Sequence, residues 1–160
     1  MDIYAFLDSL GVDYLKFGHP AVYTCEEAER LCPKMPGQSI KNLFLMAKDG
    51  QKFLIVAPKD KMVDLKILAN ILETKKLSFA SSELLMEYLG VEPGAVTLLG
   101  LVNDRYKKVK LVMDREIVEK PLQCHPLVNT TTLIIYPEGL KKFLDKIDHN
   151  PIIVDIKEKR

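Results

Sequence analysis

Lys41 is the side chain best placed to do chemistry. It lies in the stretch Ser39–Ala47 (SIKNLFLMA), where most other side chains are apolar and predict a buried strand. Alternate residues of a strand share a face, so we expect Lys41 to align with Leu43 and Leu45. Its ammonium must reach water, an anion or a carboxylate. Two interpretations follow: the head group snorkels past the strand end into solvent, or it sits at a pocket mouth, where it binds phosphate or stabilises developing negative charge.

Neither a nucleophile nor a metal site is predicted elsewhere. Cys124 and His125 are adjacent, but neighbours in an extended chain point to opposite sides, and Pro126 keeps His125 out of a helix. The three histidines, His19, His125 and His149, lack metal-ligand spacing, and the three cysteines form no C-x-x-C pair. Walker, G-x-S-x-G and G-x-G-x-x-G motifs are missing from the sequence. We therefore expect no metal or cofactor, and any catalysis should rest on positioning and electrostatics.

Length and composition favour one globular domain spanning residues 1–160. The chain is 48% hydrophobic and 28% charged, and it contains no run of about 18 apolar residues that could span a membrane. Its first residues are acidic where a signal peptide needs bases, so we expect a cytoplasmic protein without a membrane partner.

The net charge argues against some classes of binding partner. The total is only +1, which argues against a protein that grips long stretches of nucleic acid, and no DNA partner is expected. The segment 34–110 nevertheless holds 13 basic and 8 acidic residues, so it could present a modest anion-attracting surface.

The chain alternates helix and strand signals, which predicts a mixed α/β (α+β) sheet with helices packed against it. Helices are expected at 3–10, 25–32, 64–72, 82–89 and 137–146. Strands are expected at 14–17, 39–47, 51–58, 77–79, 99–102, 109–113, 130–136 and 151–155. Lys48-Asp49-Gly50 predicts a hairpin between 39–47 and 51–58, and the polar segment 103–108 (NDRYKK) predicts a second one between 99–102 and 109–113.

The order of six segments carries a family resemblance. HPAVYT, PGQSIKNLFLMAKDG, VDLKILA, LSFAS, LGVEPGAVTLLGLVND and HPLVNTTTLII follow one another between residues 19 and 135. This order resembles the YbaK/ProX-like aminoacyl-tRNA deacylases, most closely their prolyl-tRNA editing branch, over residues 19–155. The resemblance implies a YbaK-like fold with a mixed, partly barrel-like sheet surrounded by helices. It also implies a free-standing hydrolase that removes a wrongly attached amino acid, alanine in the first instance, from the acceptor end of tRNA(Pro), alone or beside prolyl-tRNA synthetase.

Four polar residues match the family's motifs. Lys41 matches the functional lysine of the KN dipeptide, Asn103 the polar residue of the LxND segment, and His125 and Asn129 the HPLxN motif. We hypothesise that Lys41 contacts the terminal phosphate or the aminoacyl carbonyl, while Asn103 and His125 hold the adenosine or the water. Taken alone, His125 could instead cap a strand entry and Asn103 could serve only a turn.

The loop that cradles the aminoacyl group in this family corresponds here to four residues, Gly94, Ala95, Val96 and Thr97. Backbone N–H groups from Gly94 to Val96 would orient the carbonyl, although a glycine after Pro93 is also ordinary turn chemistry. The family commonly has proline where this chain has Leu98, which puts the pocket shape and the preferred amino acid in doubt. Editing of Cys-tRNA(Pro) or of another small residue, or a non-catalytic sensor of amino acids or aminoacyl-tRNA, are the alternatives.

Overall fold

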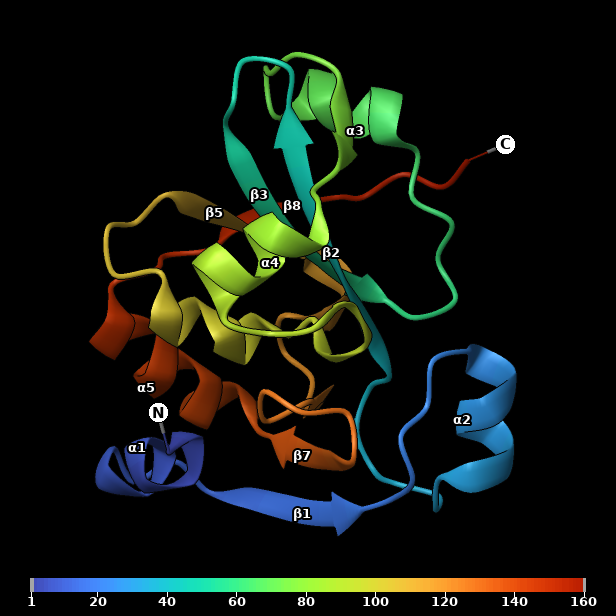
Figure 1. Ribbon diagram of the computed structural model, residues 1–160, viewed down its shortest axis with the longest axis vertical. Helices are drawn as coiled ribbons and strands as arrows, with labels where there is room; N and C mark the ends of the chain where they lie inside the picture. Colours follow the sequence, from blue (N-terminus) through green and yellow to red (C-terminus); the bar gives the residue numbers. More distant parts are fainter. Residues whose placement is uncertain (1, 160) are drawn as a thin grey trace.

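The computed structural model describes residues 2–159, which form two β-sheets flanked by helices (Figure 1). The larger sheet has the strand order β4-β2-β3-β5-β8 and the smaller one β1-β7-β6. The strands are β1 (Tyr14–Gly18), β2 (Ile40–Ala47), β3 (Lys52–Pro58), β4 (Leu77–Phe79), β5 (Val109–Asp114), β6 (Leu122–Cys124), β7 (Thr131–Ile135) and β8 (Ile152–Val154). The α-helices are α1 (Ile3–Ser9), α2 (Cys25–Leu31), α3 (Leu65–Ile71), α4 (Ser82–Leu89) and α5 (Pro137–Ile147). Three short 3-10 helices are η1 (Pro93–Ala95), η2 (Leu98–Asn103) and η3 (Arg115–Ile117). The predicted mixed α/β class is confirmed.

The predicted β2–β3 hairpin is confirmed, and its register fixes the face on which Lys41 lies. Lys41 pairs with Ala57, and Leu43 pairs with Ile55. Gly50 closes the turn with a φ of +94°, a left-handed conformation that glycine adopts without strain. Lys41 therefore shares one face of the sheet with Leu43, as the alternation predicted.

Helix boundaries follow local capping chemistry. The Thr24 hydroxyl accepts a hydrogen bond from the Glu27 N–H at 3.0 Å and starts α2, while Asp64 and Ser81 cap α3 and α4 in the same way. Gly90 ends α4 in the left-handed conformation. These helices agree with their predicted positions to within a residue or two.

The larger sheet separates two hydrophobic clusters. Phe44, Leu54 and Val56 face the larger one, to which α1, α4, α5 and η2 also contribute buried residues. Leu45, Phe53 and Ile55 face the smaller one, which α3 covers. Because both faces of the central strands are covered, these strands are nearly continuous runs of apolar residues.

The second predicted hairpin is wrong. The segment expected as a strand at 99–102 lies in η2, and β5 pairs in parallel with β3 and with β8. The Thr97 hydroxyl accepts from the Leu99 N–H at 3.2 Å and starts the helical turn. Leu98, Leu99 and Leu101 are all fully buried, and a short run of apolar residues that is buried on all sides does not distinguish helix from strand.

A further difference is the division into two sheets, since one partly barrel-like sheet was expected. The smaller sheet contains β6, a three-residue strand between Pro121 and Pro126 that no pattern indicated. It lies beside the predicted central strand β7, which is confirmed. The segment just before β2 joins the smaller sheet through a parallel bridge between Gln38 and Leu122 and a hydrogen bond from the Ser39 hydroxyl to Oε1 of Gln123. Within residues 2–159, none of the helices combines the length and apolar character needed to cross a membrane.

Candidate active site

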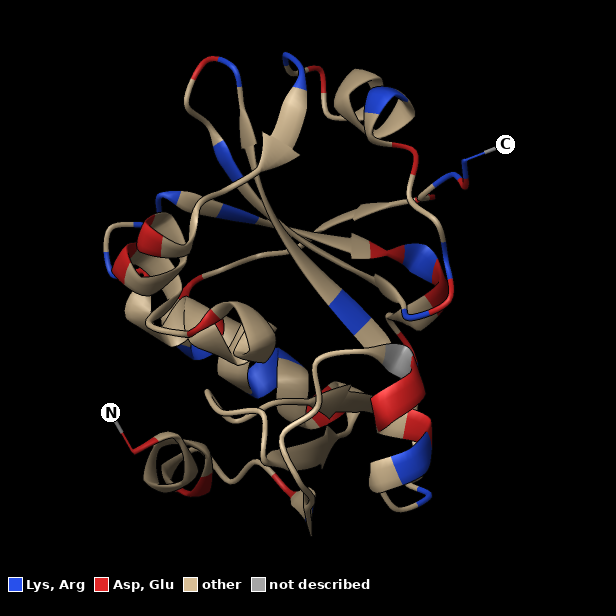
Figure 2. Cartoon of the chain, turned by 45° about the vertical axis from the view of Figure 1, so that its right-hand side comes forward, with Lys and Arg blue, Asp and Glu red and all other residues tan. Residues whose placement is uncertain are grey.

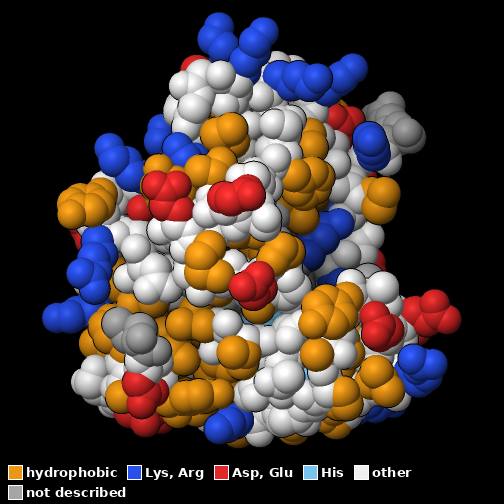
Figure 3. All heavy atoms as spheres, viewed as in Figure 1, with side chains coloured by type: hydrophobic (Ala, Val, Ile, Leu, Met, Phe, Trp, Pro, Cys, Tyr) orange, Lys and Arg blue, Asp and Glu red, His pale blue; other side chains and the backbone are white. Residues whose placement is uncertain are grey.

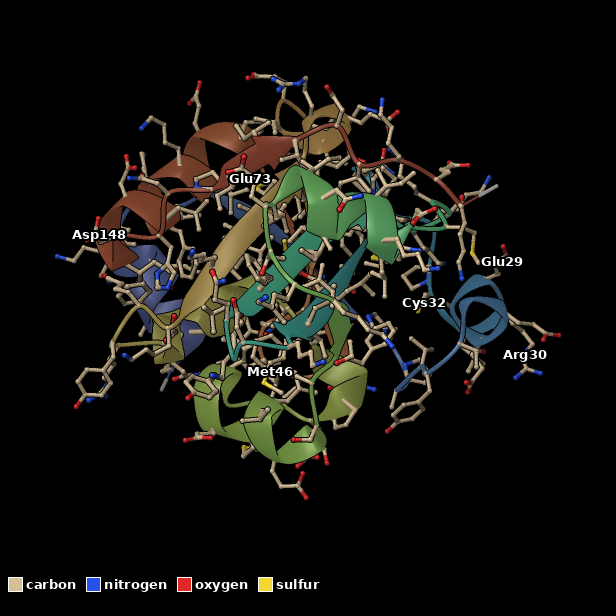
Figure 4. The ribbon with its side chains drawn as sticks, turned by 90° about the horizontal axis from the view of Figure 1, so that it is seen from above. Glu29, Arg30, Cys32, Met46, Glu73 and Asp148 are labelled. Atoms are coloured by element: carbon tan, nitrogen blue, oxygen red, sulfur yellow. The ribbon has the colours of Figure 1, made fainter. Side chains whose placement is uncertain are left out.

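A cleft of about 410 Å³ opens between α2, the start of β2 and the smaller sheet. Its walls include Glu29 and Cys32 from α2 and its end, Lys59 from the segment after β3, and His19, His125 and Thr132 from the smaller sheet and its loops. Figure 4 shows α2 at the side of the molecule, with Glu29 labelled on it, Cys32 labelled at its end and Arg30 pointing outward. The lining brings together residues separated by more than 100 positions in the sequence.

His19 is held in one tautomer by two contacts. Its Nδ1 lies 2.9 Å from the Pro20 carbonyl oxygen, which can only accept, so Nδ1 carries the proton. Its Nε2 lies 2.8 Å from the Thr132 hydroxyl, which then donates to it. His19 was not predicted as a site residue, although it opens the HPAVYT segment.

His125 lines the cleft, and its Nε2 has no hydrogen-bond partner among residues 2–159. Its Nδ1 lies 3.2 Å from the Thr131 carbonyl oxygen and must donate, which leaves the lone pair on Nε2. Burial lowers the pKa of His125 below its ordinary value, and the nearby His19, whose ring centre lies 6.3 Å away, lowers it further. The neutral ring is therefore favoured near pH 7.

Cys124 is no partner for His125. Its side chain is 1% exposed, and its thiol donates to the Leu122 carbonyl oxygen. Burial raises the pKa of the Cys124 thiol to about 12, so the thiolate needed for nucleophilic attack is not formed near neutral pH. The Cys124 thiol is therefore unsuited to act as a nucleophile with His125.

Lys41 lies on β2 directly after two residues that line the cleft, Ser39 and Ile40. It is partly buried, and its ammonium has no hydrogen bond or ion pair with another residue in the range 2–159. Its side chain projects from the sheet face opposite to that of Ile40, so it stands beside this cleft and is not part of its lining. A partly buried cation without a protein partner is suited to bind an anion.

Asn42, next to Lys41, carries a second unsatisfied group. Its Oδ1 is buried and has no hydrogen-bond partner among the described residues. Alternation places it on the face of the larger cluster, with Phe44. A buried acceptor without a partner is costly, and such groups are often found at functional sites.

Gly94, Asn129 and Tyr23 form a second group. A Cβ added at Gly94 would lie 2.7 and 2.8 Å from two carbons of the Tyr23 ring and 3.1 Å from Nδ2 of Asn129. The same Asn129 nitrogen donates to the Val22 carbonyl oxygen at 3.3 Å. The backbone at Gly94 therefore packs directly against the segment that also carries His19, and Tyr23 is a contact that the sequence did not predict.

Two of the other three residues of the predicted loop are buried. Ala95 and Thr97 are buried, Val96 is partly buried, and the Ala95 N–H already donates to the Glu92 carbonyl oxygen at 2.9 Å. Leu98 is the first residue of η2, a position where a proline would also fit because the first N–H of a helix has no partner within it. The departure from the usual proline is thus compatible with this backbone path.

Asn103 contacts the end of α4. Its Nδ2 donates to the Leu89 carbonyl oxygen at 2.9 Å, and a Cβ at Gly90 would lie 2.6 Å from that nitrogen. Among residues 2–159, no hydrogen bond joins the Asn103 side chain to His125 or Lys41. This geometry favours a positioning role, in which Asn103 holds the start of the loop that leads to Gly94.

Replacing Asn103 with alanine should lower the free energy of unfolding by about 1 kcal/mol, because the Leu89 carbonyl loses its donor at the helix end. Chemical denaturation measures the change. Asn70→Ala, at an exposed position on α3, is the control and should cost less. Unchanged stability of Asn103→Ala together with abolished activity would instead indicate direct contact with the substrate.

Comparison with known proteins identifies the family of this chain. The profile of the aminoacyl-tRNA editing domain matches residues 19–143. The chain belongs to the aminoacyl-tRNA editing family. This family member is 38% identical over 144 residues to the prolyl-tRNA editing protein ProX of Acetoanaerobium sticklandii, a match that covers 89% of this chain and 88% of that one. It is 35% identical over 152 residues to the prolyl-tRNA synthetase associated domain-containing protein 1 of Danio rerio, covering 93% and 83% of the two chains.

Solved structures support the fold of this editing domain. A crystal structure described as that of a candidate trans-editing enzyme for prolyl-tRNA synthetase superposes with a TM-score of 0.69 at 18% identity, covering 99% of this chain and 96% of that one. The YbaK-like fold expected from the sequence is therefore confirmed. The chain is an aminoacyl-tRNA deacylase.

Proposed function

We propose that this deacylase hydrolyses mischarged tRNA(Pro), with Ala-tRNA(Pro) as its preferred substrate. The named relatives support the tRNA, since they are described as a prolyl-tRNA editing protein and a prolyl-tRNA synthetase associated protein. The observation that carries the proposal is the free Nε2 of neutral His125 in a cleft bordered by the segment that packs on Gly94. The acceptor end of the tRNA is the expected partner, beside or without prolyl-tRNA synthetase.

Hydrolysis of the aminoacyl ester requires a positioned water and donors for the developing oxyanion. Water attacks the aminoacyl carbonyl carbon, the negative charge develops on the carbonyl oxygen, and the bond to the ribose oxygen breaks as that oxygen gains a proton. In this proposal, Nε2 of His125 accepts a hydrogen bond from the water and orients it. His19 and Thr132 line the neighbouring side of the cleft, and the hydrogen bond between them holds both side chains in place.

The developing oxyanion needs donors. The Ala95 N–H is already bonded to Glu92, so the N–H groups of Gly94 and Val96 are the ones proposed to orient the carbonyl. Asn129 holds the Val22 carbonyl beside Gly94 and keeps this wall in place. The Lys41 ammonium supplies the positive charge, either on the terminal phosphate or on the aminoacyl carbonyl.

The size of the pocket would determine which attached amino acid is removed. A small pocket admits alanine and rejects proline by overlap, but it rejects a residue of similar size, such as cysteine, much less strongly. A panel of tRNA(Pro) charged with alanine, cysteine, serine or proline tests this proposal through the rate of amino-acid release. Fastest release of alanine supports it, whereas faster release of cysteine would assign the alternative specificity. No release above the spontaneous rate from any member would contradict catalysis and favour a sensor.

The pH dependence of the rate tests the role of His125. Because burial lowers its pKa, the neutral ring persists as the pH falls to and below about 6.5, the ordinary value for histidine. The rate should therefore be level from pH 7.5 to about 6.5 and should decline only at lower pH, as His125 gains a proton. Single-turnover rates across this range measure the profile. His125→Gln should be slower and should lose the acidic limb, and a wild-type midpoint above 6.5 would argue against this assignment.

A further inference from the structure

A second, wider cleft of about 1040 Å³ lies between α3, the start of β4 and the C-terminal segment. Three lysines and two neutral polar side chains line it above an apolar floor: Lys66, Lys76, Lys159, Asn70, Thr74, Ala69 and Leu77. Figure 3 shows Lys and Arg side chains gathered at this end of the molecule, above the β2–β3 turn and α3. The functional site described above does not use this cleft.

The lining carries a net positive charge, with three lysines and one carboxylate. Within residues 2–159, none of the three lysines belongs to an ion pair. The carboxylate in the lining, that of Asp64, accepts from the N–H groups of Lys66 and Ile67 at 3.0 and 3.1 Å and so caps α3. Glu73 is exposed nearby, but no ion pair ties it to a lysine within the same range. The cleft therefore presents free ammonium groups to solvent.

A short segment of the chain runs from one cleft to the other. Lys59 lines the first cleft, and the linker from Lys59 leads within five residues to Asp64 in the second, a span of at most about 20 Å. The C-terminal segment lies against this linker, where the Lys159 N–H donates to the Met62 carbonyl oxygen at 2.7 Å. Figure 2 shows basic residues along the linker, α3 and the C-terminal segment, with acidic ones among them.

We propose that the wider cleft binds the sugar-phosphate backbone of the tRNA acceptor stem while the aminoacyl end occupies the first cleft. Lysines act as point charges on phosphates, and the side chains of Asn70 and Thr74 can donate to phosphate or ribose oxygens. The described lining holds no aromatic side chain on which an unpaired base could stack, which favours duplex over single-stranded RNA. This inference rests on the proposed function, from which it takes the identity of the RNA. It adds a contact between protein and RNA at a distance from the ester that is hydrolysed.

Binding of uncharged tRNA(Pro) tests the inference separately from catalysis. The cleft variant Lys66→Gln/Lys76→Gln/Lys159→Gln is compared with Lys108→Gln/Lys120→Gln/Lys146→Gln, which removes the same charge from exposed lysines that line neither cleft. Fluorescence anisotropy at several salt concentrations gives Kd and its salt dependence for the full tRNA and for a tetranucleotide of its 3′ end. Lys66→Arg/Lys76→Arg/Lys159→Arg keeps the charge and should bind like wild type.

We expect the cleft variant to bind the full tRNA at least about tenfold more weakly than wild type near 0.1 M salt. The slope of log Kd against log salt concentration should decrease by about two. Binding of the tetranucleotide should not change. The control variant should change Kd by less than about threefold. Equal losses in both glutamine variants, a loss on the tetranucleotide, or wild type that does not bind tRNA would overturn the inference.

The same experiments separate failure of this inference from failure of the proposed function. If binding behaves as expected and wild type releases no amino acid, the inference stands and the proposed function fails. If wild type releases the amino acid but the two glutamine variants share the same Kd, the inference is overturned and the proposed function stands.

Discussion

Replacing Lys41 with methionine is expected to lower kcat/KM for the mischarged tRNA by about a hundredfold. The substitution keeps most of the apolar stem that packs beside Leu43 on β2 but removes the unpaired ammonium. Loss of one group that stabilises developing negative charge typically costs a factor of about 10² to 10³. Deacylation under kcat/KM conditions measures the effect, and thermal denaturation shows whether the fold is retained.

Lys146→Met is the matched control for Lys41→Met, because Lys146 is a lysine on α5 without an ion pair among residues 2–159. It should leave kcat/KM within about twofold of wild type. Comparable rates for Lys41→Met and wild type would show that the ammonium merely snorkels into solvent. A rise in KM alone would assign Lys41 to ground-state binding of a phosphate, and an equal fall in kcat would assign it to the transition state.

Replacing Gly94 with alanine is expected to cost about a hundredfold in kcat/KM and about 1–3 kcal/mol in the free energy of unfolding. The added methyl group would lie 2.7 Å from the exposed Tyr23 ring and 3.1 Å from Nδ2 of Asn129, so these side chains or the Gly94 backbone must move. A shift of the Gly94 backbone displaces the donors proposed for the oxyanion, and small displacements of catalytic groups are costly. Deacylation kinetics and chemical denaturation measure the two effects.

Gly18 provides the matched control, since a Cβ there meets nothing within 4 Å and its φ is not in the left-handed region. Gly18→Ala should leave both kcat/KM and stability nearly unchanged. In a Tyr23→Ala background, Gly94→Ala should cost much less than in wild type, because the clashing ring is gone. If Gly94→Ala is as active as wild type, the loop is not held by Tyr23 in the way the structure indicates.

Local signals predicted most of the fold. Capping residues such as Thr24 and Ser81 and the Asp49-Gly50 turn act over about four residues or fewer, so the sequence shows them directly. The segment at 98–103 was mispredicted because complete burial of Leu98 and Leu99 removes the periodicity that separates helix from strand. The parallel position of β5 depends on pairings with β3 and β8, for which a single sequence carries no local signal.

The candidate site residues came from two sources, a local signal in the sequence and the family resemblance. Lys41 stood out as a charge in an apolar strand, and His125 came from the motif that resembles the editing family. His19 was missed because its contacts with Thr132, 113 residues away, and with the His125 ring exist only in the folded chain. Tyr23 was missed because its contact with Gly94 exists only in the folded chain. Family resemblance supplied Asn103, whose contact with Leu89 the structure then revealed.

The editing function is tested most directly by single-turnover release of the amino acid from Ala-tRNA(Pro) and from Pro-tRNA(Pro) by the wild-type protein, with Lys41→Met measured in parallel. We expect rapid release of alanine, release of proline near the spontaneous rate, and slow release of alanine by the variant. Equal release of alanine and proline, or alanine release by wild type no faster than the spontaneous reaction, would contradict the proposed editing function.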